Sequence, residues 1–156
     1  EFAAIVIEDD NKKMQEIERY ECLINVPIAL NAKITQITGI SDDDIKDKLS
    51  FVDHYDNLCD LFLGTRAMVA HNLPFDRSML ANELIRLDKL IQFPWPSVHI
   101  CTVESSMYIE GYRLSLDKLY KKATGKEHVG AHRAMADVEA LLECYKWLRK
   151  KGKISL

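Results

Sequence analysis

Short apolar runs that predict β-strands occur in both halves of the chain. Phe2 to Ile7 is a continuous apolar run that ends in a polar cluster, which is the pattern of a buried strand followed by a turn. Tyr20 to Val26 alternates well enough to form its hairpin partner, and Pro27 ends that run. Ala67 to Ala70 and Val98 to Thr102 predict two further short strands.

Helical periodicity dominates the segments between and after these strands. Ser41 suits a helix N-cap, because the acidic residues that follow it interact favourably with the helix dipole. Apolar residues at helical spacing predict helices over Phe51 to Phe62, Asp76 to Ile91, Glu104 to Tyr108, Leu116 to Ala123 and about Arg133 to Arg149. Strands first, and then strands interleaved with helices, predict a single α/β domain over residues 1–156, with a mixed sheet flanked by helices.

The composition fits one soluble domain. The chain has 156 residues, 47% of them hydrophobic and 29% charged, which is enough for one sizeable core. No apolar run approaches the roughly 18 residues needed to cross a bilayer, and the four cysteines form no CxxC pair. We therefore expect a cytoplasmic protein with no membrane association. A net charge of −3 argues against a broad electrostatic grip on nucleic acid, but it allows an enzyme that grips only a strand end.

Two aspartates lie on helix faces that should be apolar. Asp76 falls in line with the apolar positions between Leu80 and Ile91, and Asp137 lies on the shoulder of the inward stripe of the last helix, beside Leu148. Either aspartate alone could be a structural acid that caps a backbone N–H group. Two that converge from separate helices are the expected scaffold for a hard cation such as Mg²⁺ or Mn²⁺, which prefers carboxylate oxygens. Asp76 and Asp137 are therefore candidate metal ligands.

His132 is a candidate general base. It precedes Asp137 by five residues, a spacing that turns the two side chains roughly 140° apart on a regular helix. The two can share a site if Gly130 and Ala131 keep the chain in a loop, so that His132 reaches back over the site from before the helix. An imidazole there could take a proton from water near neutral pH. The alternative is a solvent-exposed loop histidine with no chemical role.

Five short motifs follow one another along the chain. They are Glu1 to Val6 (EFAAIV), Ile37 to Ile40 (ITGI), Ala70 to Asp76 (AHNLPFD), Leu114 to Leu119 (LSLDKL) and His132 to Asp137 (HRAMAD). This ordered set resembles the DEDDh 3′→5′ exonucleases, a family that includes the proofreading subunit of bacterial DNA polymerase III. The resemblance covers nearly the whole chain.

The resemblance implies a fold and a set of roles. It implies an RNase H-like fold that holds two divalent cations, Mg²⁺ or Mn²⁺, on four acids, with Asp76 and Asp137 among the ligands and His132 as the base. Thr38, Gly39 and Ile40 would border the terminal nucleotide, and Asn72 would lie near the scissile phosphate; each of these four could instead have a purely structural role in a turn. The implied partners are a single-stranded nucleic-acid 3′ end, DNA slightly favoured over RNA, and a DNA polymerase.

The first motif of the family, D-x-E-T-T-G, is missing from the sequence. In the family this motif supplies the other two acids from the strand that precedes Glu1. Neither Glu1 nor the acids from Glu8 to Asp10 fit its pattern, so we expect the sequence to be a shortened form of a longer protein. We also expect an open gap beside the Phe2 to Ile7 strand, or a separate segment that fills it. A well-paired sheet without a gap would contradict this expectation.

The expected function is metal-dependent 3′→5′ exonuclease activity, which belongs to the whole protein. One alternative is an inactive nuclease-like module that binds nucleic acid or a polymerase, and another is an unrelated α/β binding protein with structural aspartates. Four lysines could follow a phosphate backbone, although a solvated helix face is the simpler explanation for them: Lys118, Lys121, Lys122 and Lys126.

Overall fold

The structure is a computed structural model that describes residues 1–10 and 13–155. Its elements are, in order, β1 (Phe2–Asp9), β2 (Met14–Cys22), α1 (Ala32–Thr38), α2 (Asp42–Ile45), α3 (Phe51–Phe62), β3 (Ala67–Ala70), α4 (Leu73–Arg86), β4 (Val98–Cys101), α5 (Thr102–Glu110), α6 (Leu116–Thr124) and α7 (Ala134–Lys150). The α/β class predicted from the sequence is confirmed.

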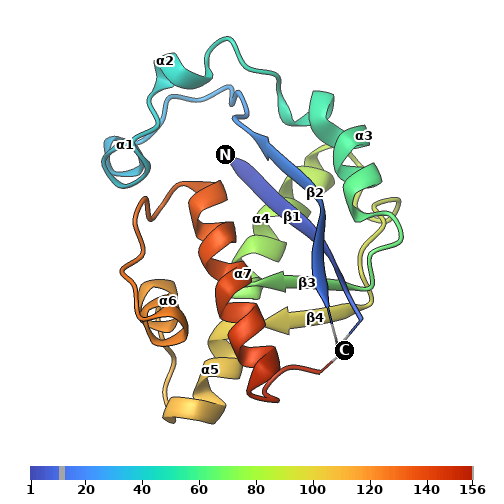
Figure 1. The fold of residues 1–156 in the computed structure, drawn as a ribbon. Helices are drawn as coiled ribbons and strands as arrows, with labels where there is room; N and C mark the ends of the chain where they lie inside the picture. The colour runs from blue at the N-terminus through green and yellow to red at the C-terminus, as the bar shows by residue number, and fades with distance from the viewer. Residues whose placement is uncertain (11–12, 156) are drawn as a thin grey trace.

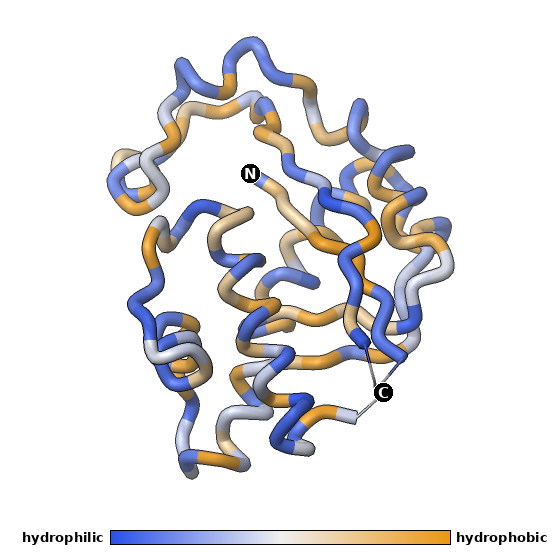
Figure 2. Tube along the Cα trace, in the orientation of Figure 1, coloured by the Kyte–Doolittle hydropathy of each residue, from blue (hydrophilic) through white to orange (hydrophobic). Residues whose placement is uncertain are grey.

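The first two strands form an antiparallel hairpin. Phe2 pairs with Cys22 and Asp9 with Met14, with a shift of register between Val6 and Ile7. The hairpin partner of the first strand was predicted over Tyr20 to Val26, and these bounds are wrong. Most of β2 is polar, and residues 15–19 are exposed on both faces of this outer strand, so they lack the apolar alternation of a strand with one packed face (Figure 2).

The other two strands pair in parallel, with Ala67 opposite Val98 and Ala70 opposite Cys101. Among the described residues β1 hydrogen-bonds only to β2 and β3 only to β4, so the strands form two separate sheets. The predicted open edge beside the first strand is therefore present. Both β1 and β3 keep one edge free of any strand partner in the described part of the chain.

Helices cover both faces of the strands (Figure 1). Side chains of Phe2 and Met68 pack with α3 and α4, whereas Ala67 and Val69 pack with α6 and α7. This division follows from the strand period, because successive side chains of β3 point to opposite faces. Helix α4 follows the carboxyl end of β3, and α7 crosses the face of the strands opposite to α3 and α4.

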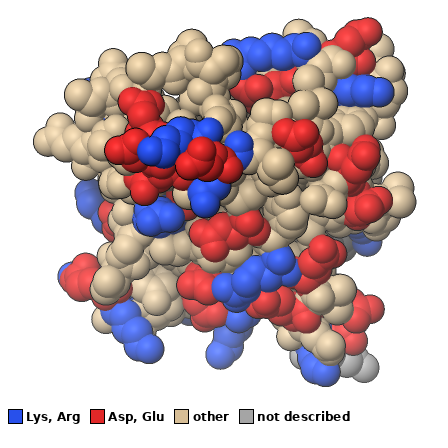
Figure 3. Space-filling model, turned by 90° about the horizontal axis from the view of Figure 1, so that it is seen from above, with Lys and Arg blue, Asp and Glu red and all other residues tan. Residues whose placement is uncertain are grey.

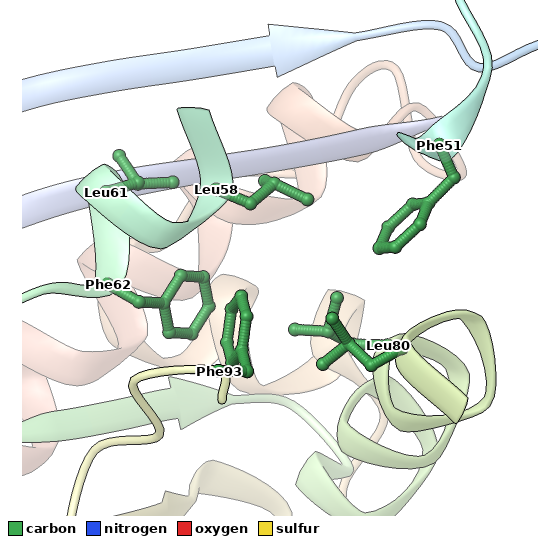
Figure 4. Packing of buried hydrophobic residues seen from close by; sticks show 7 residues of the cluster. Phe51, Leu58, Leu61, Phe62, Leu80 and Phe93 are labelled. Carbon is green, nitrogen blue, oxygen red and sulfur yellow. The ribbon is translucent and has the colours of Figure 1, made fainter. Parts of the chain in front are cut away.

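One core cluster lies between α3 and α4. Leu58 and Leu84 are fully buried in it, and the rings of Phe62 and Phe93 meet with their centroids 5.0 Å apart (Figure 4). Burial of a leucine side chain stabilises a fold by roughly 1.5–3 kcal/mol. This packing fixes the orientation of α4, and with it the first turn of that helix.

The predicted helices are present, but α4 differs from its predicted bounds at both ends, since it begins at Leu73 rather than Asp76, and α1 was not predicted. The bounds of α3 are confirmed, and α6 begins after the predicted cap Ser115 and ends at Gly125 in the left-handed conformation. The predicted helix from Asp76 to Ile91 ends early, at Arg86, because Asp88 adopts a positive φ of 55°. Ile91 keeps 93% of its surface exposed, so its place on the inward face was predicted wrongly.

The far end of α7 is pinned to the first strand. The Tyr145 hydroxyl and the Arg149 guanidinium both donate to Oδ2 of Asp9, at 2.8 and 2.9 Å. Burial, with the neighbouring Asp9 carboxylate, raises the pKa of Tyr145. These contacts hold α7 across β1 and so define where its first turn lies. No helix of the described residues is long and apolar enough to cross a membrane.

Candidate active site

Asp76 projects from the first turn of α4, directly after β3. The turn between the two elements depends on Asn72, which adopts a left-handed conformation (φ 71°) and precedes Pro74 in the first turn. Asp76 is exposed to solvent, but the protein around it displaces enough water to raise the pKa of its carboxyl group to about 6. The charge of Asp137 adds to this rise, so the two carboxylates act on one another.

The side chain of His71 holds the turn between β3 and α4 in place. Its Nε2 lies 3.1 Å from the carbonyl oxygen of Leu114, and its Nδ1 lies 2.9 Å from Oγ1 of Thr102. The carbonyl only accepts, so Nε2 carries the proton and Nδ1 accepts from the threonine hydroxyl. Burial lowers the pKa of His71, which fits this neutral form. The ring ties the end of β3 to the start of α5, and so supports the segment that carries Asp76.

Asp137 projects from the first turn of α7, and His132 lies in the loop before that helix. His132 has a positive φ of 73°, and its backbone N–H donates to Oδ1 of Asp137 at 3.2 Å. The loop predicted around Gly130 and Ala131 is therefore present. The His132 side chain is exposed.

Glu1 fixes the start of α7. Its carboxylate accepts hydrogen bonds from Nε and Nη2 of Arg133 and, at 2.8 Å, from the backbone N–H of Ala134. Burial opposes the charge of Glu1, but these hydrogen bonds outweigh it and lower its pKa. A carboxylate at a helix N-terminus also interacts favourably with the helix dipole. Glu1 is thus a capping residue of the helix that carries Asp137.

His128 is a residue of this site that the sequence did not predict. Its side chain is only 4% exposed, and it lies between Asp117 of α6 and Asp137 of α7. Nothing in the local sequence marks it, because it stands in a loop and meets both aspartates only through the packing of α6 against α7. Its place four residues before His132 is the one signal that could have drawn attention to it.

The predicted nucleotide-binding residues lie at two places. Asn72 borders Asp76 in the β3–α4 turn, whereas Thr38, Gly39 and Ile40 end α1 and the loop after it. The Thr38 hydroxyl donates to the Ile34 carbonyl and accepts from the Ile40 backbone N–H, and Ile40 is buried. These local contacts are structural. No hydrogen bond or ion pair among the described residues joins this segment to the side chain of Asp76 or Asp137.

The donor set suits a hard cation. Asp76 and Asp137 offer carboxylate oxygens, and their mutual repulsion is relieved when a divalent cation lies between them. No group of three metal-ligating side chains occurs within residues 1–10 and 13–155. Acidic and basic residues are interspersed on the face seen from above in Figure 3, so this face is not a broad basic surface. The charge of Asp137 acts on Asp76, which is the one link between the two predicted ligands among the described residues.

Comparison with known proteins shows the family. Residues 1–145 match the exonuclease family RNase_T. The chain belongs to this family. The family resemblance predicted from the sequence is thereby confirmed, and the chain is a domain of the exonuclease family.

Two individual proteins place the domain among its relatives. It is 30% identical over 156 residues to the DNA polymerase III PolC-type of Bacillus subtilis (strain 168), an alignment that covers 97% of this chain and 10% of that protein. The chain thus spans about a tenth of the length of this curated relative. Its fold is similar to that of Exonuclease X in complex with 5′ overhanging duplex DNA, with a TM-score of 0.67 and 18% identity over 98% of this chain and 83% of that chain. The RNase H-like fold expected from the resemblance is therefore confirmed.

Proposed function

We propose that this domain is the catalytic part of a metal-dependent 3′→5′ exonuclease that removes nucleotides from a single-stranded 3′ end. The observation that carries the proposal is the pair Asp76 and Asp137. They come from separate helices, and the charge of one raises the pKa of the other. Two aspartates so arranged repel one another unless a cation binds, which favours a metal site over a structural one.

Two further carboxylates would complete the site. We propose that they come from a strand that lies between β1 and β3, each of which has one edge without a strand partner among the described residues. A central strand there would carry acidic side chains to the carboxyl end of β3, where Asp76 begins α4. Two divalent cations, Mg²⁺ or Mn²⁺, when bound would stabilise negative charge on the attacking and leaving oxygens.

The residues of this chain would have separate roles in the reaction. Asp76 and Asp137 hold the cations, and His132 takes the proton from the attacking water, which its exposed place beside Asp137 allows. Asn72 lies next to Asp76 and would hydrogen-bond near the scissile phosphate. Thr38 to Ile40 would border the terminal nucleotide, if α1 approaches the site when substrate binds.

The relatives favour DNA as the substrate. The fold neighbour was solved with duplex DNA, and the 30%-identical relative is a DNA polymerase. We therefore propose a DNA 3′ end, with RNA as the weaker substrate, and a DNA polymerase as the partner in a proofreading role. A module that binds nucleic acid without cutting it is the second candidate, because the described residues supply only two of the four acids.

An exonuclease assay on the protein in its full natural length tests the proposal. Single-stranded DNA and RNA, labelled at the 3′ or the 5′ end, are incubated with Mg²⁺, with Mn²⁺ and with EDTA. We expect release of labelled mononucleotide from the 3′ end, and loss of this release in EDTA. Activity that persists in EDTA, or release that starts from the 5′ end, contradicts the mechanism.

Three variants assign the roles. Asp137→Ala should abolish activity, and His132→Ala should lower kcat by a factor of about 10²–10⁴, the usual contribution of a general base. The matched control is His99→Ala, because His99 is an exposed histidine of β4. Wild-type rates in His132→Ala would remove His132 from the mechanism. Tight DNA binding without any hydrolysis in the wild type would instead support the binding module.

A further inference from the structure

His128 makes polar contacts on both sides of its ring. Nδ1 lies 2.8 Å from Oδ1 of Asp117, and Nε2 lies 3.3 Å from the carbonyl oxygen of Ala136 and 3.5 Å from Oδ1 of Asp137. Every polar neighbour in these contacts is an oxygen that accepts. A ring nitrogen that carries a proton therefore donates, Nδ1 toward Asp117 and Nε2 toward the first turn of α7.

The surroundings keep this ring in one orientation. Its side chain is 4% exposed, and it packs against the ring of Tyr120, with centroids 5.6 Å apart. Asp117 lies in the first turn of α6, so the helix holds the acceptor in place. A ring fixed on one side by a helix and a neighbouring tyrosine can in turn fix whatever it contacts on the other side.

The contact on the other side is the candidate ligand Asp137. Its Oδ1 also accepts from the backbone N–H of His132 at 3.2 Å, so one carboxylate oxygen has two nitrogen neighbours on the loop side. The other carboxylate oxygen of Asp137, Oδ2, has no hydrogen-bonding neighbour among the described residues. Carboxylates that bind metals are commonly oriented by hydrogen bonds from residues behind them, and loss of such residues weakens metal binding.

The geometry points to His128 as a positioning residue, anchored by Asp117, that orients the Asp137 carboxylate toward the cation site and fixes the loop that carries His132. This inference rests on the proposed function for the identity of the site, because Asp137 must be a ligand for its orientation to matter. His128 itself touches neither substrate nor cation. A purely structural ring between α6 and α7 would stabilise the fold without changing the affinity for metal.

Three variants separate orientation from packing. His128→Phe keeps a ring against Tyr120 but removes both polar contacts, and His128→Gln keeps one donor. Asp117→Asn leaves the ring in place and weakens only its anchor, at an exposed position where the fold tolerates change. His99→Gln is the control, because His99 is exposed on β4 and contacts neither aspartate.

Two measurements on the full-length protein do not depend on catalysis. Mn²⁺ binding is followed by electron paramagnetic resonance, with Asp137→Ala to identify the signal of this site. Hydrogen–deuterium exchange of the peptide over residues 130–137 reports whether the His132 amide remains bonded to Asp137. We expect a loss of Mn²⁺ affinity of about 10–100-fold in His128→Phe, faster exchange in that peptide, and a smaller change in the same direction in Asp117→Asn and His128→Gln.

The results decide the proposal in each case. Unchanged Mn²⁺ affinity and exchange in a folded His128→Phe protein overturn it. If His128→Phe fails to fold, then Asp117→Asn decides, and wild-type values in both measurements overturn the proposal. Effects of His128→Phe and Asp117→Asn that add independently in the double variant also overturn it, since residues acting through one another are coupled. If the variants show these changes but the wild type cuts no DNA, the proposed function fails and the positioning role stands.

Discussion

Asp76 should destabilise the metal-free protein at neutral pH, and Asp76→Asn should relieve this. The folded-state pKa is raised from 3.8 to about 6, mainly by loss of solvent and further by the charge of Asp137. Because the folded state holds this proton more tightly than the unfolded chain, the stability of the fold decreases as the pH rises from about 4 to above 6. At pH 7.5 the ionised carboxylate therefore carries the full penalty, and the amide of asparagine carries none.

The size of the expected difference in stability follows from the shift in the pKa of Asp76. A change from 3.8 to about 6 would correspond to ~3 kcal/mol in a site closed to solvent. Asp76 is exposed, and screening by water reduces the expected difference to about 1 kcal/mol. This is large enough to measure by denaturant unfolding, since a change of that size shifts the midpoint clearly.

Urea unfolding in EDTA, from pH 4.5 to 7.5, measures the difference directly. Asp76→Asn should exceed the wild type by about 1 kcal/mol at pH 7.5, and the two should converge toward pH 4.5. Addition of Mn²⁺ should reverse the order, because only the wild type binds the ion through this carboxylate. Equal stability across the whole range in EDTA would refute the reasoning about Asp76. A lower stability of Asp76→Asn in EDTA would do so as well.

Three further variants test the framework around the site. Glu1→Ala should cost about 1.5–3 kcal/mol in unfolding free energy, because it removes charge-assisted hydrogen bonds to the start of α7; the exposed Glu18→Ala should cost less than ~0.5 kcal/mol, and equal costs would contradict the capping role. Leu58→Ala should cost about 2–5 kcal/mol by urea unfolding, whereas the 70%-exposed Leu63→Ala at the end of the same helix should be nearly neutral. Gly39→Ala should speed hydrogen exchange in α1, because a side chain at φ 73° costs about 1–2 kcal/mol; unchanged exchange would contradict this.

Local patterns predicted the elements that depend on local interactions. The bounds of α3 follow from its apolar spacing and caps. The same helical geometry singled out Asp76 and Asp137, and the structure places both in the first turns of their helices. The end of α4 could not be read from apolar spacing, because the pattern continues through Ile91 while the backbone turns away at Asp88.

Features that depend on tertiary packing were not predicted. The strand β2 has polar residues on both faces near its start, because it lies at the outside of the sheet, so alternation placed it too late in the chain. His128 joins Asp117 to Asp137 only because α6 packs against α7, and no spacing along the sequence expresses that contact. Asp9 is a similar case, since its partners Tyr145 and Arg149 are far away in sequence.

The unpaired edges of β1 and β3 make this domain suited to assembly from two pieces. An extended peptide that paired with both edges would gain backbone hydrogen bonds on both sides and would join the hairpin and the parallel pair into one sheet. A synthetic peptide bearing acidic side chains, added in trans, would then act as a chemical switch for the site. Peptides that differ only in those acids would separate its effect on folding from its effect on chemistry.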